Sequence, residues 1–232
     1  MRRRAEAPAF PPTPPTSSDD PRAVAAHDWD AFATVTHMVN HWERPGWTPD
    51  TRAFYWMLVP DSEPFTAQVL ECQKALENLR FDAVNRASLH LTLGRVGDTD
   101  TLSQAALRSL GAAARDAAPA SFDLVAVPLT ASTGAIRYSV APWHPILELH
   151  AALDAAGKTL GLPQERSAAS LRPHIGIAYC NRPVPADAVR ASIAPLRSLP
   201  HVLMRIHDVQ LVELRRRKNS YTWTTIHRIQ LR

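Results

Sequence analysis

The sequence predicts an α+β fold made of two related halves. One observation is a pair of short apolar strands, each with a histidine at its centre: Leu89-His90-Leu91-Thr92-Leu93 and Pro173-His174-Ile175-Gly176-Ile177. The other is a succession of strands and helices that occurs twice, with one of these histidines in each copy. Side chains alternate between the faces of a strand, so the aliphatic residues share one face and the histidine projects from the other. Each half should therefore anchor one strand in a core and present one imidazole.

The first half begins with an apolar strand over residues 54–59, which ends at Pro60. Helical periodicity follows, with apolar side chains at Phe65, Val69, Cys72, Ala75, Leu76 and Leu79. The histidine strand comes next, and His90 lies 30 residues after Pro60. Another helix and another strand complete this half, which we expect to span about residues 51–128.

The second half repeats this order over about residues 129–232. A strand over residues 136–141 ends at Pro142, and His174 follows 32 residues later. The helical pattern between them has apolar residues at Ile146, Leu149, Leu153 and Leu160. The repeat indicates an internal duplication, and a pseudo-twofold pairing of the halves would set His90 and His174 face to face.

Two histidines that converge on one cleft form an acid–base pair that needs neither a metal nor a covalent nucleophile. A single histidine on a strand is more often a structural residue. It is the matched position of the two in a duplicated pattern that favours catalysis.

These residues resemble the paired H-x-[T/S]-apolar motifs of the two-histidine (2H) phosphoesterases, and most closely the 2′-5′ RNA ligase-like family. The resemblance covers about residues 37–232, including the segments His41–Trp47 and Tyr221–Trp223. It implies a bilobal α+β fold with antiparallel sheets around a central cleft that holds both catalytic histidines. It also implies action on 2′,3′-cyclic phosphates or 2′-5′ linkages of RNA or nucleotides, by His/His catalysis without cofactor or metal and with reverse RNA ligation as a second direction.

The second motif departs from that pattern at Gly176. The family places a hydroxyl donor for a phosphate oxygen two residues after each histidine; Thr92 supplies it in the first motif, and Gly176 cannot in the second. Arg172 on the same strand face could substitute with a charge-assisted bond, or the glycine could let backbone amides approach the phosphate. Alternatively the site is degenerate, and the protein is a non-catalytic module that binds RNA ends or cyclic nucleotides. A phosphodiesterase for signalling nucleotides is a third interpretation.

The first 50 residues are expected to lie outside the duplicated unit. Residues 1–24 are rich in proline and predict a disordered tail. Residues 25–50 predict a helix and a connector, with apolar positions at Trp29, Phe32, Val35, Met38, Val39 and Trp42. His37 and His41 would then lie one turn apart on this helix. That spacing can bind zinc, but the sequence offers no evident third ligand, so we expect a packing role.

The charge of the chain agrees with an anionic partner but does not identify one. The net charge is +4, and four basic residues, Arg215–Lys218, precede the turn of a predicted hairpin between strands over 204–214 and 221–231. This basic tip could grip the phosphates of a polynucleotide, or it could protect an exposed sheet edge. Tyr55, Trp56, Tyr138 and Trp223 are each expected in the core rather than on a base-stacking surface.

Cysteine usage and hydropathy predict a cytoplasmic protein. Cys72 and Cys180 fit no metal-binding or disulfide spacing, which is typical of a reducing compartment. No apolar run approaches the length of a membrane span, and the residues after Met1–Arg4 lack the apolar core of a signal peptide. We expect a monomer whose partner is an RNA terminus or a small nucleotide that carries a cyclic phosphate.

Overall fold

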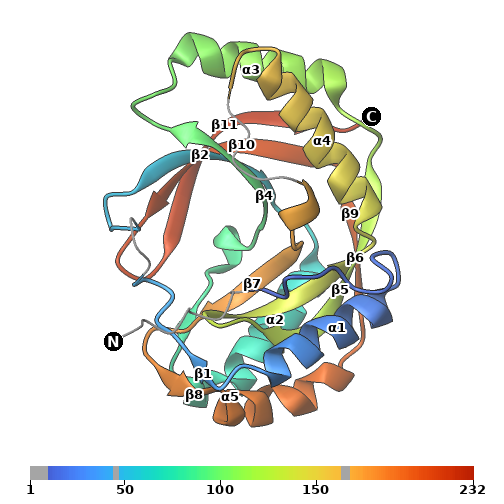
Figure 1. Ribbon diagram of the computed structural model, residues 1–232, viewed down its shortest axis with the longest axis vertical. Helices are drawn as coiled ribbons and strands as arrows, with labels where there is room; N and C mark the ends of the chain where they lie inside the picture. Colours follow the sequence, from blue (N-terminus) through green and yellow to red (C-terminus); the bar gives the residue numbers. More distant parts are fainter. Residues whose placement is uncertain (1–9, 44–46, 163–167) are drawn as a thin grey trace.

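The computed structural model describes residues 10–43, 47–162 and 168–232. Helices pack against two antiparallel sheets, one in the upper and one in the lower part of Figure 1. This arrangement confirms the predicted α+β class. None of the helices in the described ranges is long and apolar enough to cross a membrane.

The first sheet has the strand order β11-β10-β2-β4. Its members are β2 (Arg52–Leu58), β4 (Leu91–Asp98), β10 (Asp208–Arg216) and β11 (Tyr221–Gln230). Helices α3 (Gln104–Ala117) and α4 (His144–Lys158) pack on each other, and they contact the sheet at β11 and β4 respectively. Helix α3 begins where the Ser103 hydroxyl accepts a hydrogen bond from the Ala106 amide, and it buries Leu107 and Leu110.

The second sheet has the order β3-β7-β6-β5-β9. Its members are β3 (Asp82–Ala83), β5 (Phe122–Ala131), β6 (Ala135–Ala141), β7 (His174–Tyr179) and β9 (Val202–Ile206). Helices α1 (Pro21–Ala33) and α2 (Glu63–Ala75) cover opposite faces, because successive residues of β6 point to different helices. The Tyr138 hydroxyl donates to the Gln68 side chain of α2, whereas the Ser139 hydroxyl donates to Asp28 of α1. Tyr138 is fully buried, as the sequence predicts.

The remaining elements are short. Helix α5 (Ala186–Ile193) also packs on the second sheet, at β5, and strands β1 (His37–Met38) and β8 (Val184–Pro185) form a separate two-stranded ribbon. Single 3₁₀ turns occupy Glu77–Leu79, Arg86–Ser88, Ala168–Ser170 and Ala194–Ser198.

The two sheets do not follow the expected division of the chain near residue 128. Strand β5 belongs to the first half of the sequence but pairs with β6 and β9 in the second sheet. Strands β10 and β11, from the end of the chain, complete the first sheet beside β2. The predicted continuous strand over 204–214 is interrupted at His207, because β9 and β10 belong to different sheets. Each sheet therefore contains strands from both halves.

The N-terminal segment also differs from the prediction. Helix α1 begins at Pro21, after an Asp20 cap, and ends at Ala33, so the predicted helix through Trp42 is wrong. His37 lies in β1 and His41 follows it, and they do not share a helix face. The ribbon with β8 replaces the last helical turns.

Part of the predicted disordered tail is ordered by contacts with the second half. Residues 10–20 run along that half as an extended segment, which we call the strap. The Arg172 side chain donates to the carbonyls of Pro11 and Pro12, and the Trp143 amide donates to the carbonyl of Ser18. Proline lacks an amide hydrogen but keeps its carbonyl acceptor, so side-chain donors can still order a proline-rich segment. The expected disorder of residues 1–9 lies outside the described residues.

Candidate active site

A pocket of about 410 Å³ lies where the two sheets meet, and both sheets line it. Residues of the first sheet and its approach are Tyr55, His90, Thr92, Leu93, Gly94, Arg95, Leu214 and Tyr221. Residues of the second sheet are Ala135, His174, Gly176 and Tyr179. His90, Thr92, His174 and Gly176, which the sequence singled out, thus line one pocket.

His90 stands immediately before β4 and is fixed by its own backbone. Leu89, Leu91 and Leu93 are almost fully buried, as the predicted alternation requires. The imidazole Nδ1 lies 2.8 Å from the carbonyl oxygen of Ser88. A carbonyl only accepts, so Nδ1 carries the hydrogen and Nε2 remains for a ligand.

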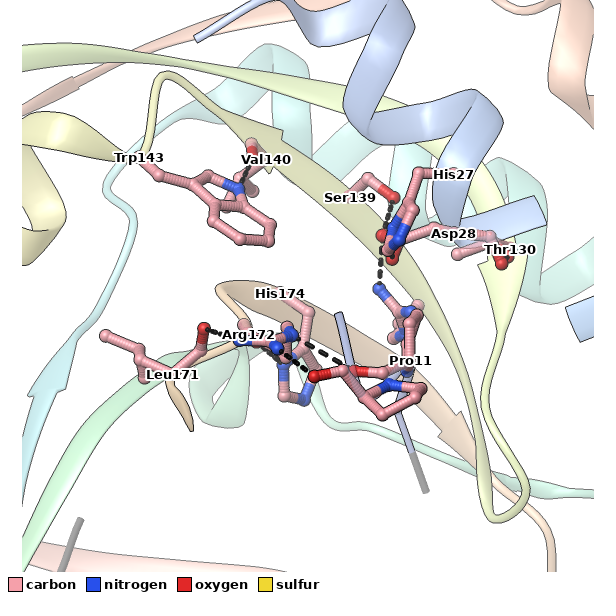
Figure 2. Close-up of polar contacts among 12 residues, drawn as sticks. Pro11, His27, Asp28, Thr130, Ser139, Val140, Trp143, Leu171, Arg172 and His174 are labelled. Atoms are coloured by element: carbon pink, nitrogen blue, oxygen red, sulfur yellow. Dashed lines mark hydrogen bonds and ion pairs between the residues drawn. The ribbon is translucent and has the colours of Figure 1, made fainter. Parts of the chain in front are cut away.

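His174 is held in the same way at the first residue of β7. Its Nδ1 donates to the carbonyl oxygen of Arg172 at 2.7 Å (Figure 2). Ile175 and Ile177 anchor the strand from the opposite face, each with no exposed surface. Both histidines therefore use the carbonyl two residues earlier to set the tautomer, which leaves both Nε2 atoms for proton transfer.

The surroundings lower the pKa of both histidines. Burial lowers the pKa of His90 below its ordinary value of 6.5, against the opposing effect of the Ser88 carbonyl. Burial lowers the pKa of His174 further, to about 4, with a contribution from the positive charge of Arg137. A charge on His90 also lowers the pKa of His174, as expected for two rings in one pocket.

Comparison with known proteins agrees with this geometry. The profile of the 2′-5′ RNA ligase superfamily matches residues 60–218, which include both histidine motifs. The chain belongs to the 2′-5′ RNA ligase superfamily. The resemblance to two-histidine phosphoesterases is thereby confirmed.

Solved structures share the fold of this superfamily member at low sequence identity. The protein TT0787 of Thermus thermophilus is 18% identical with a TM-score of 0.59, covering 78% of this chain and 98% of its own. A structure described as a phosphoesterase is 14% identical with a TM-score of 0.58, covering 78% and 99%. Escherichia coli LigT, in a complex with 3′-AMP, is 14% identical with a TM-score of 0.56, covering 78% and 98%. A search of curated proteins found no match.

A β-bulge adds a residue to the site of this superfamily member that the sequence analysis missed. Thr92 pairs with Met57 and Gly94 pairs with Trp56, so Leu93 is an extra residue in β4. The bulge shifts the alternation and brings Arg95 into the pocket beside Thr92. Arg95 is also paired with Asp98. Strict alternation from His90 would have placed Arg95 on the core face.

Gly176 lines the pocket, and there is room for a side chain. A Cβ built there would lie 3.7 Å from the nearest atom of the Tyr179 ring, which is an ordinary van der Waals contact. Arg172, proposed from the sequence as the compensating group, is not among the pocket-lining residues. Its guanidinium binds the strap carbonyls of Pro11 and Pro12 and the carbonyls of Ala169 and Leu171. Figure 2 shows Pro11 and Leu171 beside Arg172. Strand alternation applies only from His174 onward, because β7 begins there.

Aromatic side chains form one wall of the pocket. The His41 ring stacks on Tyr179 with centroids 4.1 Å apart, and its Nε2 lies 2.7 Å from the Tyr221 hydroxyl. The indole of Trp47 donates to the same hydroxyl at 2.9 Å. The segment His41–Trp47 was part of the resemblance, but its place at the pocket had no signal of its own in the sequence. Residues 44–46 lie outside the described ranges.

The other aromatic residues have different surroundings. Trp56 is buried in the core, as predicted. Tyr55 and Trp223 are only partly buried and pack against the core, so the predicted core position is confirmed only in part for each of them, and Tyr55 also lines the pocket. Trp223 packs its ring edge-on against His90, with centroids 5.3 Å apart.

The predicted C-terminal hairpin is confirmed, but its charge is partly used within the fold. Strands β10 and β11 pair from Asp208 to Arg216 and from Tyr221 to Gln230. Arg216 is buried and donates to the carbonyl of Trp42, and Arg215 pairs with Glu213. Arg217 and Lys218 are exposed at the turn. Cys180 is buried, and its thiol donates to the Arg182 carbonyl.

Proposed function

We propose that the protein is a metal-independent phosphodiesterase that opens 2′,3′-cyclic phosphates or cleaves 2′-5′ linkages of RNA or nucleotides. The observation that carries this proposal is the matched pair His90 and His174. Each ring keeps Nδ1 on a backbone carbonyl and offers Nε2 to the same pocket. Such a pair can remove a proton from a nucleophile on one side of a phosphorus atom and supply one to the leaving oxygen on the other.

The pKa values suggest which ring has which role. His174, with a pKa of about 4, stays neutral in mildly acidic solution and acts as the base that accepts a proton from water, whereas His90 is the ring that carries a proton there. The new oxygen–phosphorus bond forms as the bond to one ribose oxygen breaks, and His90 donates its proton to that oxygen. The Thr92 hydroxyl donates to a non-bridging oxygen as charge develops there. When a 5′-hydroxyl of RNA replaces water, the same exchange joins two RNA ends.

The size and chemistry of the pocket support a nucleotide as substrate. A volume of about 410 Å³ is within the range of small-molecule sites. The fold relative LigT has been solved in complexes with 3′-AMP, ATP and NADP⁺, which are all nucleotides. Tyr179, Tyr221 and Trp47 line the pocket, and aromatic side chains are the residues against which bases pack in nucleotide sites.

Incubation with 2′,3′-cyclic AMP and with an RNA that ends in a cyclic phosphate, in the presence of EDTA, tests this proposal. Chromatography should show ring opening of at least one substrate at a rate that EDTA does not change. The His90→Ala variant is the matched control. Turnover that disappears in EDTA would refute the metal-independent mechanism.

A binding module without turnover is the second candidate, and two observations favour it. Gly176 lacks the hydroxyl of the second motif, and Phe10 of the strap packs on His174 with ring centroids 4.6 Å apart. For such a module the same incubation would return both substrates intact, while calorimetry would still detect their binding.

A further inference from the structure

A buried arginine, Arg137, lies on the same face of the second sheet as His174 and Gly176, close to the place of the missing hydroxyl, but it does not itself line the pocket. Arg137 of β6 pairs with Gly176 of β7, and Ser139 pairs with His174 two residues along. Paired residues of neighbouring strands share a face of the sheet, so Arg137 and Gly176 lie on the same face as His174. The positive charge of Arg137 lowers the pKa of His174, as expected for neighbours on one face of the sheet.

Arg137 has more hydrogen-bonding capacity than its partner uses. It is 1% exposed, and its Nη1 donates to Oδ2 of Asp28 at 2.8 Å. Its Nε is buried without a partner among the described residues. Native proteins seldom leave such a donor unpaired, so an unpaired donor beside a pocket requires an explanation.

One aromatic ring covers both Arg137 and His174. The Phe10 ring centroid lies 5.0 Å from the Arg137 guanidinium carbon and 4.6 Å from the centre of the His174 ring. Phe10 itself lines the pocket. The strap that carries Phe10 is held next to His174 by Arg172, through the carbonyls of Pro11 and Pro12 (Figure 2).

We propose that Arg137 is the phosphate-binding residue of the His174 half of the pocket, in place of the hydroxyl absent at Gly176, and that Phe10 covers it until a phosphate ligand displaces the ring. This inference rests on the proposed function for its substrate class, a phosphate mono- or diester. A guanidinium binds phosphate oxygens through charge-assisted hydrogen bonds, which are stronger than those of a hydroxyl. The face of the Phe10 ring attracts the same guanidinium through a cation–π contact, so the ring competes with phosphate for Arg137.

A purely structural role for the Asp28–Arg137 pair makes a different prediction from phosphate binding. If the pair only holds α1 on the sheet, loss of either partner should disturb the pocket to the same extent. If Arg137 binds phosphate, Asp28→Asn keeps the cation and relieves it of a competing anion, whereas Arg137→Gln removes it. The Asp28→Asn/Arg137→Gln double variant leaves no buried charge without a partner. It therefore provides the test if Arg137→Gln alone is unstable.

The experiment is calorimetric titration of inorganic phosphate into the full chain at about pH 7.5, where a histidine of ordinary pKa is mostly neutral. Phe10→Ala should bind phosphate more tightly than wild type. In the Phe10→Ala background, Arg137→Gln and the Asp28→Asn/Arg137→Gln double variant should weaken binding about 10- to 100-fold, the loss of a hydrogen bond to a charged group. Asp28→Asn should bind at least as tightly as its parent. Arg172→Gln removes an equal charge whose described hydrogen bonds all go to backbone carbonyls, and it should change nothing in this background.

Three outcomes would overturn the inference. Weaker binding in Phe10→Ala would make Phe10 part of the ligand site and not its cover. Equal losses in Asp28→Asn and Arg137→Gln would assign the pair a structural role. Turnover of 2′,3′-cyclic AMP by the same variants separates this inference from the proposed function. Arg137-dependent phosphate binding without turnover in any variant would refute only the phosphodiesterase, and turnover with Arg137-independent binding would refute only the role of Arg137.

Discussion

At the scale of single residues, the two histidines are held so similarly that only their surroundings can give them different roles. In both, a carbonyl two residues earlier binds Nδ1–H, so both neutral rings present a bare Nε2. Neither tautomer nor strand position then distinguishes an acid from a base. The charge of Arg137 next to His174 contributes to the difference, because it disfavours a second positive charge there.

Replacement of either histidine should remove most of the activity. We expect His90→Ala and His174→Ala each to reduce turnover of a cyclic phosphate by about 10² to 10⁴, the usual contribution of a positioned acid or base. The double variant should be little slower than either single variant, because both groups act in one transition state. Steady-state kinetics on the three variants measure this. Losses that multiply fully would show that the two rings act independently.

If the two histidines act as proposed, their lowered pKa values predict an activity optimum on the acidic side of neutrality. The value of kcat/KM should fall as the pH drops through about 4, where His174 gains a proton and can no longer act as a base. It should also fall as the pH rises through the pKa of His90, below 6.5, where the acid loses its proton. In Phe10→Ala the acidic limb should move to higher pH, because removal of the ring reduces the burial of His174. A rate that rises steadily into alkaline solution would contradict this assignment.

Gly176→Ser tests whether the missing hydroxyl limits catalysis. The position has room for Cβ, and the new hydroxyl would be directed into a pocket that already contains His174. We expect kcat to rise by up to about tenfold with a smaller change in KM, because the bond strengthens as charge develops. Gly176→Ala adds the same Cβ without the donor and should leave kcat unchanged. Equal loss of activity in both variants would mean that any side chain obstructs the phosphate.

At the scale of elements, the strap is the segment whose removal should be most informative. Deletion of residues 1–12 removes Phe10 and the carbonyls that Arg172 binds, but it keeps Ser18 and the Asp20 cap of α1. We expect kcat/KM to rise and the melting temperature to change little, because Phe10, Pro11 and Pro12, the described residues of the deleted segment, are not buried. The measurement compares the truncated chain with full-length Phe10→Ala, which should behave in the same way. A lower kcat/KM in the truncated chain would show that the strap completes the site.

The elements also show what a single sequence can and cannot predict. The strand and helix patterns around His90 and His174 predicted most of the elements. Four of the five candidate site residues line one pocket in the structure. Strand alternation was applied to Arg172, but β7 begins only at His174, so the position predicted for the Arg172 side chain was wrong. Arg95 was not predicted, because a β-bulge shifts the alternation within β4. The ordering of the strap and the Asp28–Arg137 ion pair both depend on contacts between residues more than 100 positions apart. Local periodicity in a sequence carries no information on such contacts.

At the scale of the whole molecule, the exchange of strands makes the two halves interdependent. Strand β10 lies between β2 and β11, and its Val209, Leu211 and Val212 are fully buried. We expect fragments 1–131 and 132–232 each to lack a cooperative thermal transition, because each lacks strands that its sheets require. Mixed together, they should regain one. Circular dichroism measures both, and cooperative unfolding of either fragment alone would contradict the prediction.

The anchoring of the strap also has a consequence for binding equilibria. A ring attached to the chain by a short segment meets its site at an effective concentration on the order of millimolar, whatever the protein concentration. Dilution therefore cannot relieve its competition with a ligand, and every ligand of the His174 half should show its affinity reduced by the same factor. Ligands that also occupy the aromatic wall would gain additional binding that the ring cannot oppose. The strap would thus act as an intramolecular competitor that favours binding of whole nucleotides over binding of free phosphate.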